Sequence, residues 1–188
     1  MTESSASHLR PVPAEGETAA PDYDGPAGLL DALVSPPHSA LVLGAGGAGR
    51  AAAWALREAG VEVAVWNRTP ERAAALAREL GVRHAERPEP APLIVNATSV
   101  GLDPVGEADV LAALRIDAIA PPELLVDLVY GDEPTALCRW AARGGARVVD
   151  GLEVLVRQGA RSLARWTGRE APLEAMREGA RSIASKQR

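Results

Sequence analysis

The sequence has one cysteine, Cys138, and one lysine, Lys186, in 188 residues. A single cysteine excludes an intrachain disulfide, and no spacing of cysteine and histidine predicts a zinc site. Because the lysine lies so near the C-terminus, we expect no lysine chemistry inside the folded body. No apolar run reaches the roughly 18 residues that a membrane-spanning helix needs. These shortages exclude disulfide scaffolds, zinc domains and spanning helices.

Basic residues are also outnumbered, with 20 Lys and Arg against 25 Asp and Glu and a net charge of −5. A nucleic-acid-binding protein would need a basic face. The N-terminus lacks the basic-then-apolar pattern of a signal peptide. We therefore expect a cytoplasmic protein whose partner is a small molecule, and neither nucleic acid nor a membrane.

The rest of the composition, 47% hydrophobic and 24% charged, is typical of a globular protein. Residues 1–26 lack apolar periodicity and are expected to form a disordered tail. A short helix is expected over 28–34. Strands then alternate with helices, which predicts a parallel sheet with right-handed crossovers. The expected strands are 40–43, 61–66, 82–84, 93–95, 124–128 and 147–149, and the helices between them are 47–59, 70–80 and 135–143.

The expected fold class is therefore α/β, a doubly wound parallel sheet of the Rossmann type followed by C-terminal helices. We assign residues 27–150 to a dinucleotide-binding domain. Residues 151–188 contain two further helices, expected over 151–166 and 172–185.

A glycine-rich segment follows the first expected strand and opens the first long helix. It reads Gly44-Ala45-Gly46-Gly47-Ala48-Gly49 and matches GxGxxG. In that context the first glycine permits a tight turn, the second lets the backbone approach a pyrophosphate, and the third lets helix and strand pack closely. Free N–H groups and the helix dipole favour the phosphate. We interpret this segment as a dinucleotide-binding loop rather than a turn without a ligand.

The end of the second strand indicates which dinucleotide is bound. An NAD site has an acidic residue there to hold the ribose hydroxyl groups, but this chain reads Asn67-Arg68-Thr69, with Arg72 one turn later. Guanidinium groups attract a 2′-phosphate, whereas a carboxylate repels it. Cations at a helix N-terminus also oppose the helix dipole, so an anionic ligand explains them better than solvated side chains do. We predict NADP rather than NAD.

Polar groups also follow later strands, at the sheet edge where ligands bind in this fold. Asn96, Thr98 and Ser99 follow the fourth strand, and they are interpreted either as cofactor contacts or as a polar turn that ends at a glycine. Tyr130 follows the fifth strand and is expected to face the cleft. Gln158 lies about two turns into the first C-terminal helix, where a solvated surface is its ordinary explanation.

Several motifs together resemble the C-terminal half of the shikimate dehydrogenase family. They occur in the order of that family, from about residue 41 to the C-terminus: GAGGAGRA at 44–51, NRT at 67–69, NATSVGL at 96–102, DLVY at 127–130, GLEVLVRQGA at 151–160 and WTG at 166–168. The resemblance implies reversible reduction of 3-dehydroshikimate to shikimate by NADPH, in aromatic amino-acid biosynthesis.

The resemblance also implies roles for single residues. The glycine loop would bind the cofactor phosphates, and Asn67, Arg68, Thr69 and Arg72 would hold the adenosine 2′-phosphate. Leu128 and Gly151 would line the nicotinamide pocket. Tyr130 and Gln158 would contact the substrate, shikimate or a related ring acid.

The sequence departs from the family in its substrate half. The family's N-terminal substrate domain, with a catalytic lysine and aspartate, has no counterpart here, so no catalytic residue is identified, and Asp24 is at most a relic of that aspartate. Three interpretations follow: an enzyme domain that works with a separate substrate-domain chain or derives from a truncated gene, a non-catalytic NADPH-binding module, or a related enzyme for a ring acid such as quinate.

Apolar side chains of the C-terminal helices would lose the cover that the missing domain gives them. Because an uncovered apolar patch marks a binding surface, we expect a homodimer or a separate partner chain. The side chains expected to be uncovered are Leu152, Leu155, Leu163, Trp166, Leu173 and Met176.

Overall fold

The computed structural model describes residues 24–33, 35–102, 106–131 and 133–184. Six parallel strands form one sheet in the order β3-β2-β1-β4-β5-β6. The strands are β1 (Ser39–Leu43), β2 (Glu62–Trp66), β3 (Arg83–His84), β4 (Leu93–Asn96), β5 (Leu124–Asp127) and β6 (Arg147–Asp150). This order is that of dinucleotide-binding Rossmann folds, with the switch point between β1 and β4. The predicted fold class is confirmed.

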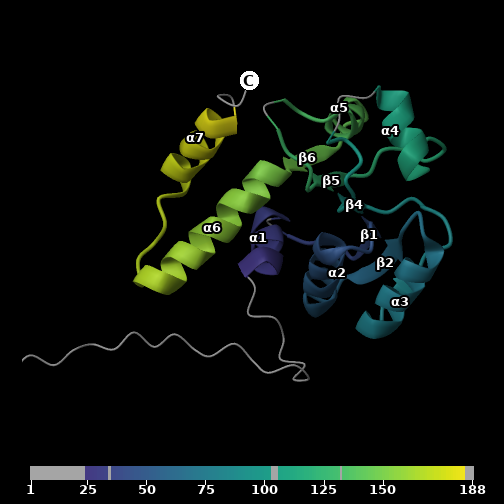
Figure 1. The fold of residues 1–188 in the computed structure, drawn as a ribbon, viewed down its shortest axis with the longest axis horizontal. Helices are drawn as coiled ribbons and strands as arrows, with labels where there is room; N and C mark the ends of the chain where they lie inside the picture. The colour runs from purple at the N-terminus through teal and green to yellow at the C-terminus, as the bar shows by residue number, and fades with distance from the viewer. Residues whose placement is uncertain (1–23, 34, 103–105, 132, 185–188) are drawn as a thin grey trace, which may run out of the picture.

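The described part of the chain also contains seven helices (Figure 1). They are α1 (Asp24–Leu33), α2 (Gly47–Glu58), α3 (Pro70–Leu80), α4 (Glu107–Leu114), α5 (Ala136–Arg143), α6 (Gly151–Thr167) and α7 (Leu173–Ala184). All six expected strands are found, as are the expected helices, with ends shifted by a few residues. Helix α1 begins at Asp24, so three residues of the expected tail are helical, and residues 1–23 lie outside the described part.

Helix α4 was not predicted from the sequence. It has eight residues, begins with Glu107 and Asp109 in its first turn, and buries two side chains, Val110 and Leu114. Two buried positions four residues apart are too few to establish a helical period. The acidic first turn, which suits the positive end of a helix dipole, was the available signal.

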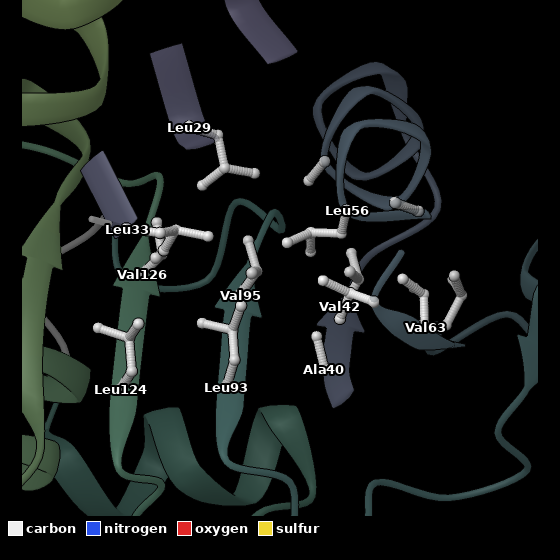
Figure 2. Packing of buried hydrophobic residues seen from close by; sticks show 14 of the residues in the cluster. Leu29, Leu33, Ala40, Val42, Leu56, Val63, Leu93, Val95, Leu124 and Val126 are labelled. Atoms are coloured by element: carbon white, nitrogen blue, oxygen red, sulfur yellow. The ribbon is translucent and has the colours of Figure 1, made fainter. Parts of the chain in front are cut away.

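One face of the sheet is covered by α1, α2, α3 and α6. Residues at alternate positions of each strand point to this face, since successive side chains of a strand alternate. Figure 2 shows Leu29 and Leu33 of α1 and Leu56 of α2 beside Val42 and Val95 of the central strands. All of these side chains are at most 2% exposed. Val154 of α6 belongs to the same cluster, so α6 is part of this core and the assigned boundary at residue 150 does not separate it.

The opposite face is covered by α4 and α5. It buries the alternate strand positions, Leu41, Ile94 and Leu125 among them, against Leu114 and Leu137 of the helices. Both faces being covered explains why the strands have short, continuous apolar sequences rather than alternating ones. Asn96 and Asp127 lie two residues after Ile94 and Leu125, so their side chains point to the same α4–α5 face.

The first and last described helices, α1 and α7, both pack against α6. Figure 1 shows α6 between α1 and α7, and an ion pair of 2.6 Å joins Arg161 of α6 to Asp31 of α1. Helix α7 packs against the other side of α6, where Glu153 accepts hydrogen bonds from Arg177. Within the described residues, no helix is both long and apolar enough to cross a membrane.

Candidate functional site

The glycine loop connects β1 to α2 at the carboxyl edge of the sheet. Gly44 has φ of +111°, and a Cβ there would lie 2.7 Å from the carbonyl oxygen of Ala97. A Cβ at Gly49 would lie 2.0 Å from the carbonyl oxygen of Gly44. These two positions therefore need glycine for the turn and for close helix packing, as predicted.

The middle of the loop faces open space. Gly46, Gly47 and Ala48 are exposed, and a Cβ at Gly46 or Gly47 would meet nothing within 4 Å. Gly46 is the N-cap of α2 and offers no side chain to its first N–H groups. An anion can approach these N–H groups and the positive end of the helix dipole.

The end of β2 lies beside this loop. The backbone N–H of Gly44 donates to the carbonyl oxygen of Trp66 at 2.7 Å. Asn67 ties the two segments together, because its Oδ1 accepts from the Ala45 N–H at 3.2 Å while its Nδ2 donates to the Thr69 carbonyl at 3.0 Å. The Asn67 side chain thus links the loop to the start of α3 through two hydrogen bonds.

Two arginines follow at the start of α3. Arg68 and Arg72 are exposed, and neither forms an ion pair with a described residue. Thr69 is the N-cap of α3 by position, but its side chain makes no capping hydrogen bond. The region therefore presents two guanidinium groups and a hydroxyl group, with Glu71 as the acidic residue of the first turn.

The segment after β4 uses most of its polar groups internally. Asn96 is completely buried, and its Oδ1 accepts from the N–H and the hydroxyl of Thr98 at 3.1 and 2.7 Å. The hydroxyl of Thr98 in turn accepts from the Val100 N–H. A ligand cannot reach the side chain of Asn96 in this conformation, so the expectation of a direct Asn96 contact is not supported. Ser99 is the exposed one of the three predicted residues.

Leu128, Gly151 and Tyr130 come together where β5 and β6 end. A Cβ at Gly151 would lie 2.6 Å from the Leu128 carbonyl oxygen and 3.0 Å from Cδ1 of Tyr130. Leu128 is half-buried, and Tyr130 is 52% exposed. Asp150 caps α6 by accepting from the Glu153 N–H at 2.8 Å.

Gln158 lies elsewhere on α6. A Cβ at Gly28 would lie 2.8 Å from the Gln158 backbone nitrogen, so this turn of α6 packs closely on α1. Seven residues of helix separate it from Gly151, which is about 10 Å along the axis. Asp24 begins α1, and its side chain lies outside the described part of the structure.

A cavity of about 450 Å³ adjoins Tyr130. It lies between the segment after β5 and the last turn of α7, and it does not include the glycine loop. Its lining includes Glu133, Thr135, Asp150, Arg181 and Ser182. No cluster of three or more potential metal ligands occurs among the residues that the structure describes.

Two protein-family models match the chain. The model for shikimate / quinate 5-dehydrogenase matches residues 35–127, and the model for the shikimate 5′-dehydrogenase C-terminal domain matches residues 151–181. Together they cover the glycine loop, the start of α3, the strands β1 to β5 and α6.

Curated relatives have the same family name. Shikimate dehydrogenase (NADP(+)) of Thermus thermophilus is 46% identical over 173 residues, which are 89% of this chain and 64% of the relative. The enzyme of the same name from Halobacterium salinarum is 42% identical over 149 residues, 76% of this chain and 54% of the relative. The chain thus spans less than two thirds of the length of these relatives.

Solved structures of the same family are similar to this chain. Shikimate 5-dehydrogenase of Thermus thermophilus, in complex with NADP(H) and shikimate, has a TM-score of 0.70 at 42% identity, over 85% of this chain and 62% of that chain. Shikimate dehydrogenase of Aquifex aeolicus has a TM-score of 0.69 at 34% identity, over 84% of this chain and 60% of that chain.

Proposed function

The chain belongs to the shikimate dehydrogenase family, and we propose that it is the NADP-binding part of an enzyme that reduces 3-dehydroshikimate to shikimate. In this proposal, residues 27–150 bind the cofactor and α6 and α7 complete the wall of the site. The observation that carries the proposal is the exposed glycine loop at the start of α2, which a hydrogen bond to Asn67 joins to the segment that contains Arg68 and Arg72.

The glycine loop supports the pyrophosphate assignment. Gly44 and Gly49 bring the backbone of α2 against β1, while Gly46 and Gly47 leave the outer side of the turn open. The first N–H groups of a helix with no side-chain cap remain available to phosphate oxygens. Asn67 holds the loop against the end of β2.

Arg68 and Arg72 support NADP over NAD. A guanidinium group forms charge-assisted hydrogen bonds with a phosphate, often in pairs. No acidic residue lies between Glu62 and Glu71 to accept from a ribose 2′-hydroxyl. We infer that the two arginines, with Thr69, hold the 2′-phosphate.

Leu128, Gly151 and Tyr130 are proposed to surround the nicotinamide and the reacting carbonyl. Bound NADPH supplies the hydride, and the protein must place a proton donor beside the forming alkoxide. Tyr130, which is 52% exposed, carries a hydroxyl group at this edge, whereas the family has a catalytic lysine. Lys186 is the one lysine among these 188 residues, so the NADP-binding part does not itself supply the family's catalytic lysine.

The lack of such a lysine in this part gives a second candidate function, a non-catalytic NADPH-binding module. Titration of the full chain with NADPH and NADH in a calorimeter tests the cofactor site that both functions share. Micromolar binding of NADPH with much weaker NADH binding supports it, and absence of heat with either dinucleotide contradicts it. Oxidation of shikimate by NADP, with and without a lysine-bearing substrate domain from a relative, then separates enzyme from module.

We also propose that the outer surface of α6 and α7 binds another polypeptide, either that substrate domain or a second copy of the chain. Leu155 and Trp166 of α6 and Ile183 of α7 are 43%, 80% and 63% exposed, and large apolar side chains as exposed as these are candidates for contacts with a partner. Met176, expected on the same surface, instead packs on α6: a Cβ at Gly159 would lie 3.3 Å from its Cε.

A further inference from the structure

A buried carboxylate joins the ends of the two strands that border the proposed nicotinamide region. Asp127 ends β5, is in register with Asn96 at the end of β4, and is completely buried like it. Its Oδ1 accepts from Asn96 Nδ2 at 2.8 Å and from the Val129 N–H at 3.1 Å. Its Oδ2 accepts from the Thr135 hydroxyl at 2.6 Å, and the Cys138 thiol lies 3.7 Å away.

Further hydrogen bonds fix the direction in which these partners donate. The Thr135 oxygen accepts from the Cys138 N–H at 3.1 Å, so its proton is directed to Asp127. The Asn96 oxygen accepts twice from Thr98, so its amide group is directed to Asp127. Each partner is a donor, which suits an acceptor-only, ionised carboxylate. Burial raises the pKa of Asp127, and the hydrogen bonds from Thr135, Val129 and Asn96 oppose that rise.

Core packing alone does not explain this side chain. Desolvating a carboxylate costs several kcal/mol, and no cation among the described residues faces Asp127 to offset that cost. An apolar residue would fill the end of β5 at lower cost. Buried polar groups of this kind are instead suited to fixing one arrangement of the segments around them.

The segments held by Asp127 form both sides of the site. Through Asn96 it holds the turn after β4, whose Ala97 carbonyl lies against Gly44 of the glycine loop. Through Val129 and Thr135 it holds the segment after β5, which carries Leu128 and Tyr130. The two segments also touch, since a Cβ at Gly101 would lie 3.9 Å from Thr135 Cβ and 4.0 Å from Val129 Cγ1.

We propose that Asp127 is a positioning residue that sets the distance between the glycine loop and the segment carrying Leu128 and Tyr130, and so determines the affinity for the nicotinamide half of the dinucleotide. This inference rests on the proposed function. It gives no role to Asp127 in binding the adenosine half, which lies at the end of β2 on the other side of the glycine loop.

The test compares two ligands that share the adenosine half. Adenosine 2′,5′-bisphosphate contains the ribose 2′-phosphate without a nicotinamide, whereas NADPH contains both. Both are titrated into the full chain and into Asp127→Asn, with Asp117→Asn as the matched control, because Asp117 is an exposed carboxylate after α4. Asparagine keeps the shape of the side chain and removes its charge and one acceptor.

In Asp127→Asn we expect the Kd for NADPH to rise about tenfold, which corresponds to the loss of one charge-assisted hydrogen bond. The Kd for the bisphosphate should stay within about twofold. Asp117→Asn should change neither. Equal weakening of both ligands in Asp127→Asn would mean a general structural role and would overturn the proposal, as would an unchanged Kd for NADPH.

Two further outcomes are distinguishable. If the unmodified chain binds neither ligand, the proposed function fails and this inference with it; if it binds both and Asp127→Asn has no selective effect, the inference alone fails. Thermal unfolding checks that each variant is folded. Should Asp127→Asn not fold, Thr135→Val removes one donor to the same carboxylate, and we expect an increase of about threefold in the Kd for NADPH alone.

Discussion

The carbonyl oxygen of Gly44 occupies the space that a side chain at Gly49 would need, at 2.0 Å from the position of its Cβ. The contact lies where β1 turns into α2, and backbone on both sides prevents a small adjustment. Gly46, between them, has open space at the corresponding position. Glycines of one motif are therefore required for different reasons.

Exchanging each glycine for alanine separates those reasons. Gly49→Ala should lower the free energy of unfolding by about 3 kcal/mol, because α2 must move away from β1. Gly46→Ala should leave stability almost unchanged but weaken NADPH binding, because the added methyl group lies where the pyrophosphate approaches. Chemical denaturation and calorimetry give the two quantities, and equal loss of stability in both variants would contradict this division.

The two arginines after β2 should determine the preference for NADPH. Removal of either guanidinium group, in Arg68→Ala or Arg72→Ala, should raise the Kd for NADPH about tenfold and leave that for NADH nearly unchanged. Arg78→Ala is the matched control, since Arg78 lies in the last turn of the same helix. A similar effect from Arg78→Ala would show that net charge alone is responsible.

The attachment of α7 to α6 should depend on pH. The hydrogen bond from Arg177 lowers the pKa of Glu153 below its usual value of 4.5, with a further contribution from Arg157, while burial opposes the shift. A carboxyl whose pKa is lowered on folding stabilises the fold above its unfolded pKa and loses that contribution as the pH falls through the folded value. We therefore expect α7 to loosen below about pH 4.5, with little change between about pH 6 and 8.

Substitution of Glu153 by glutamine tests that dependence. Glu153→Gln should reduce stability by about 1 kcal/mol at pH 7, and this difference should disappear as the pH falls through the lowered pKa of Glu153 in the folded protein. Glu174→Gln is the control, because Glu174 also pairs with Arg177 but is 82% exposed. Amide hydrogen exchange in α7 is the measurement, and a pH-independent effect of Glu153→Gln would exclude the ionic contribution.

The exposed apolar side chains of α6 and α7 should promote association. Sedimentation velocity at rising concentration should show a dimer that is weakened by Trp166→Ser. Leu102→Ser is the control, because Leu102 is 64% exposed but follows β4. A monomer at every concentration would exclude self-association and leave a separate substrate domain as the proposed partner.

The sheet was predictable from the sequence because its strands are short apolar runs separated by helices with glycine at their ends. Gly81, for example, has the left-handed conformation that ends α3. The glycine loop was predictable because backbone geometry restricts its key positions to glycine, so the residue types alone reveal the turn. Helix α4 was missed because its amphipathic pattern has two buried residues in eight.

The site itself was predictable only in part. Sequence spacing placed Asn96, Thr98 and Ser99 after the fourth strand, at the edge where the strands end, but it could not show that the Asn96 side chain points into the protein and is hydrogen-bonded to Asp127 and Thr98. Side chains of a strand alternate between the two faces of the sheet, and the sequence alone did not show to which face the last residue of β4 points. Asp127 lies within a recognisable motif, but its buried hydrogen bonds could not be predicted, because its partners come from three separate segments.

The ion pair between Asp31 and Arg161 joins residues 130 positions apart in the chain, and this separation has a consequence for biosynthesis. At typical rates of translation, α1 leaves the ribosome on the order of ten seconds before α6 exists to cover it. During that time Leu29 and Leu33 lack part of the apolar packing that surrounds them in the folded protein. The nascent chain is therefore most vulnerable to aggregation and to chaperone capture during that interval, and α1 becomes fully covered only after α6 has been synthesised.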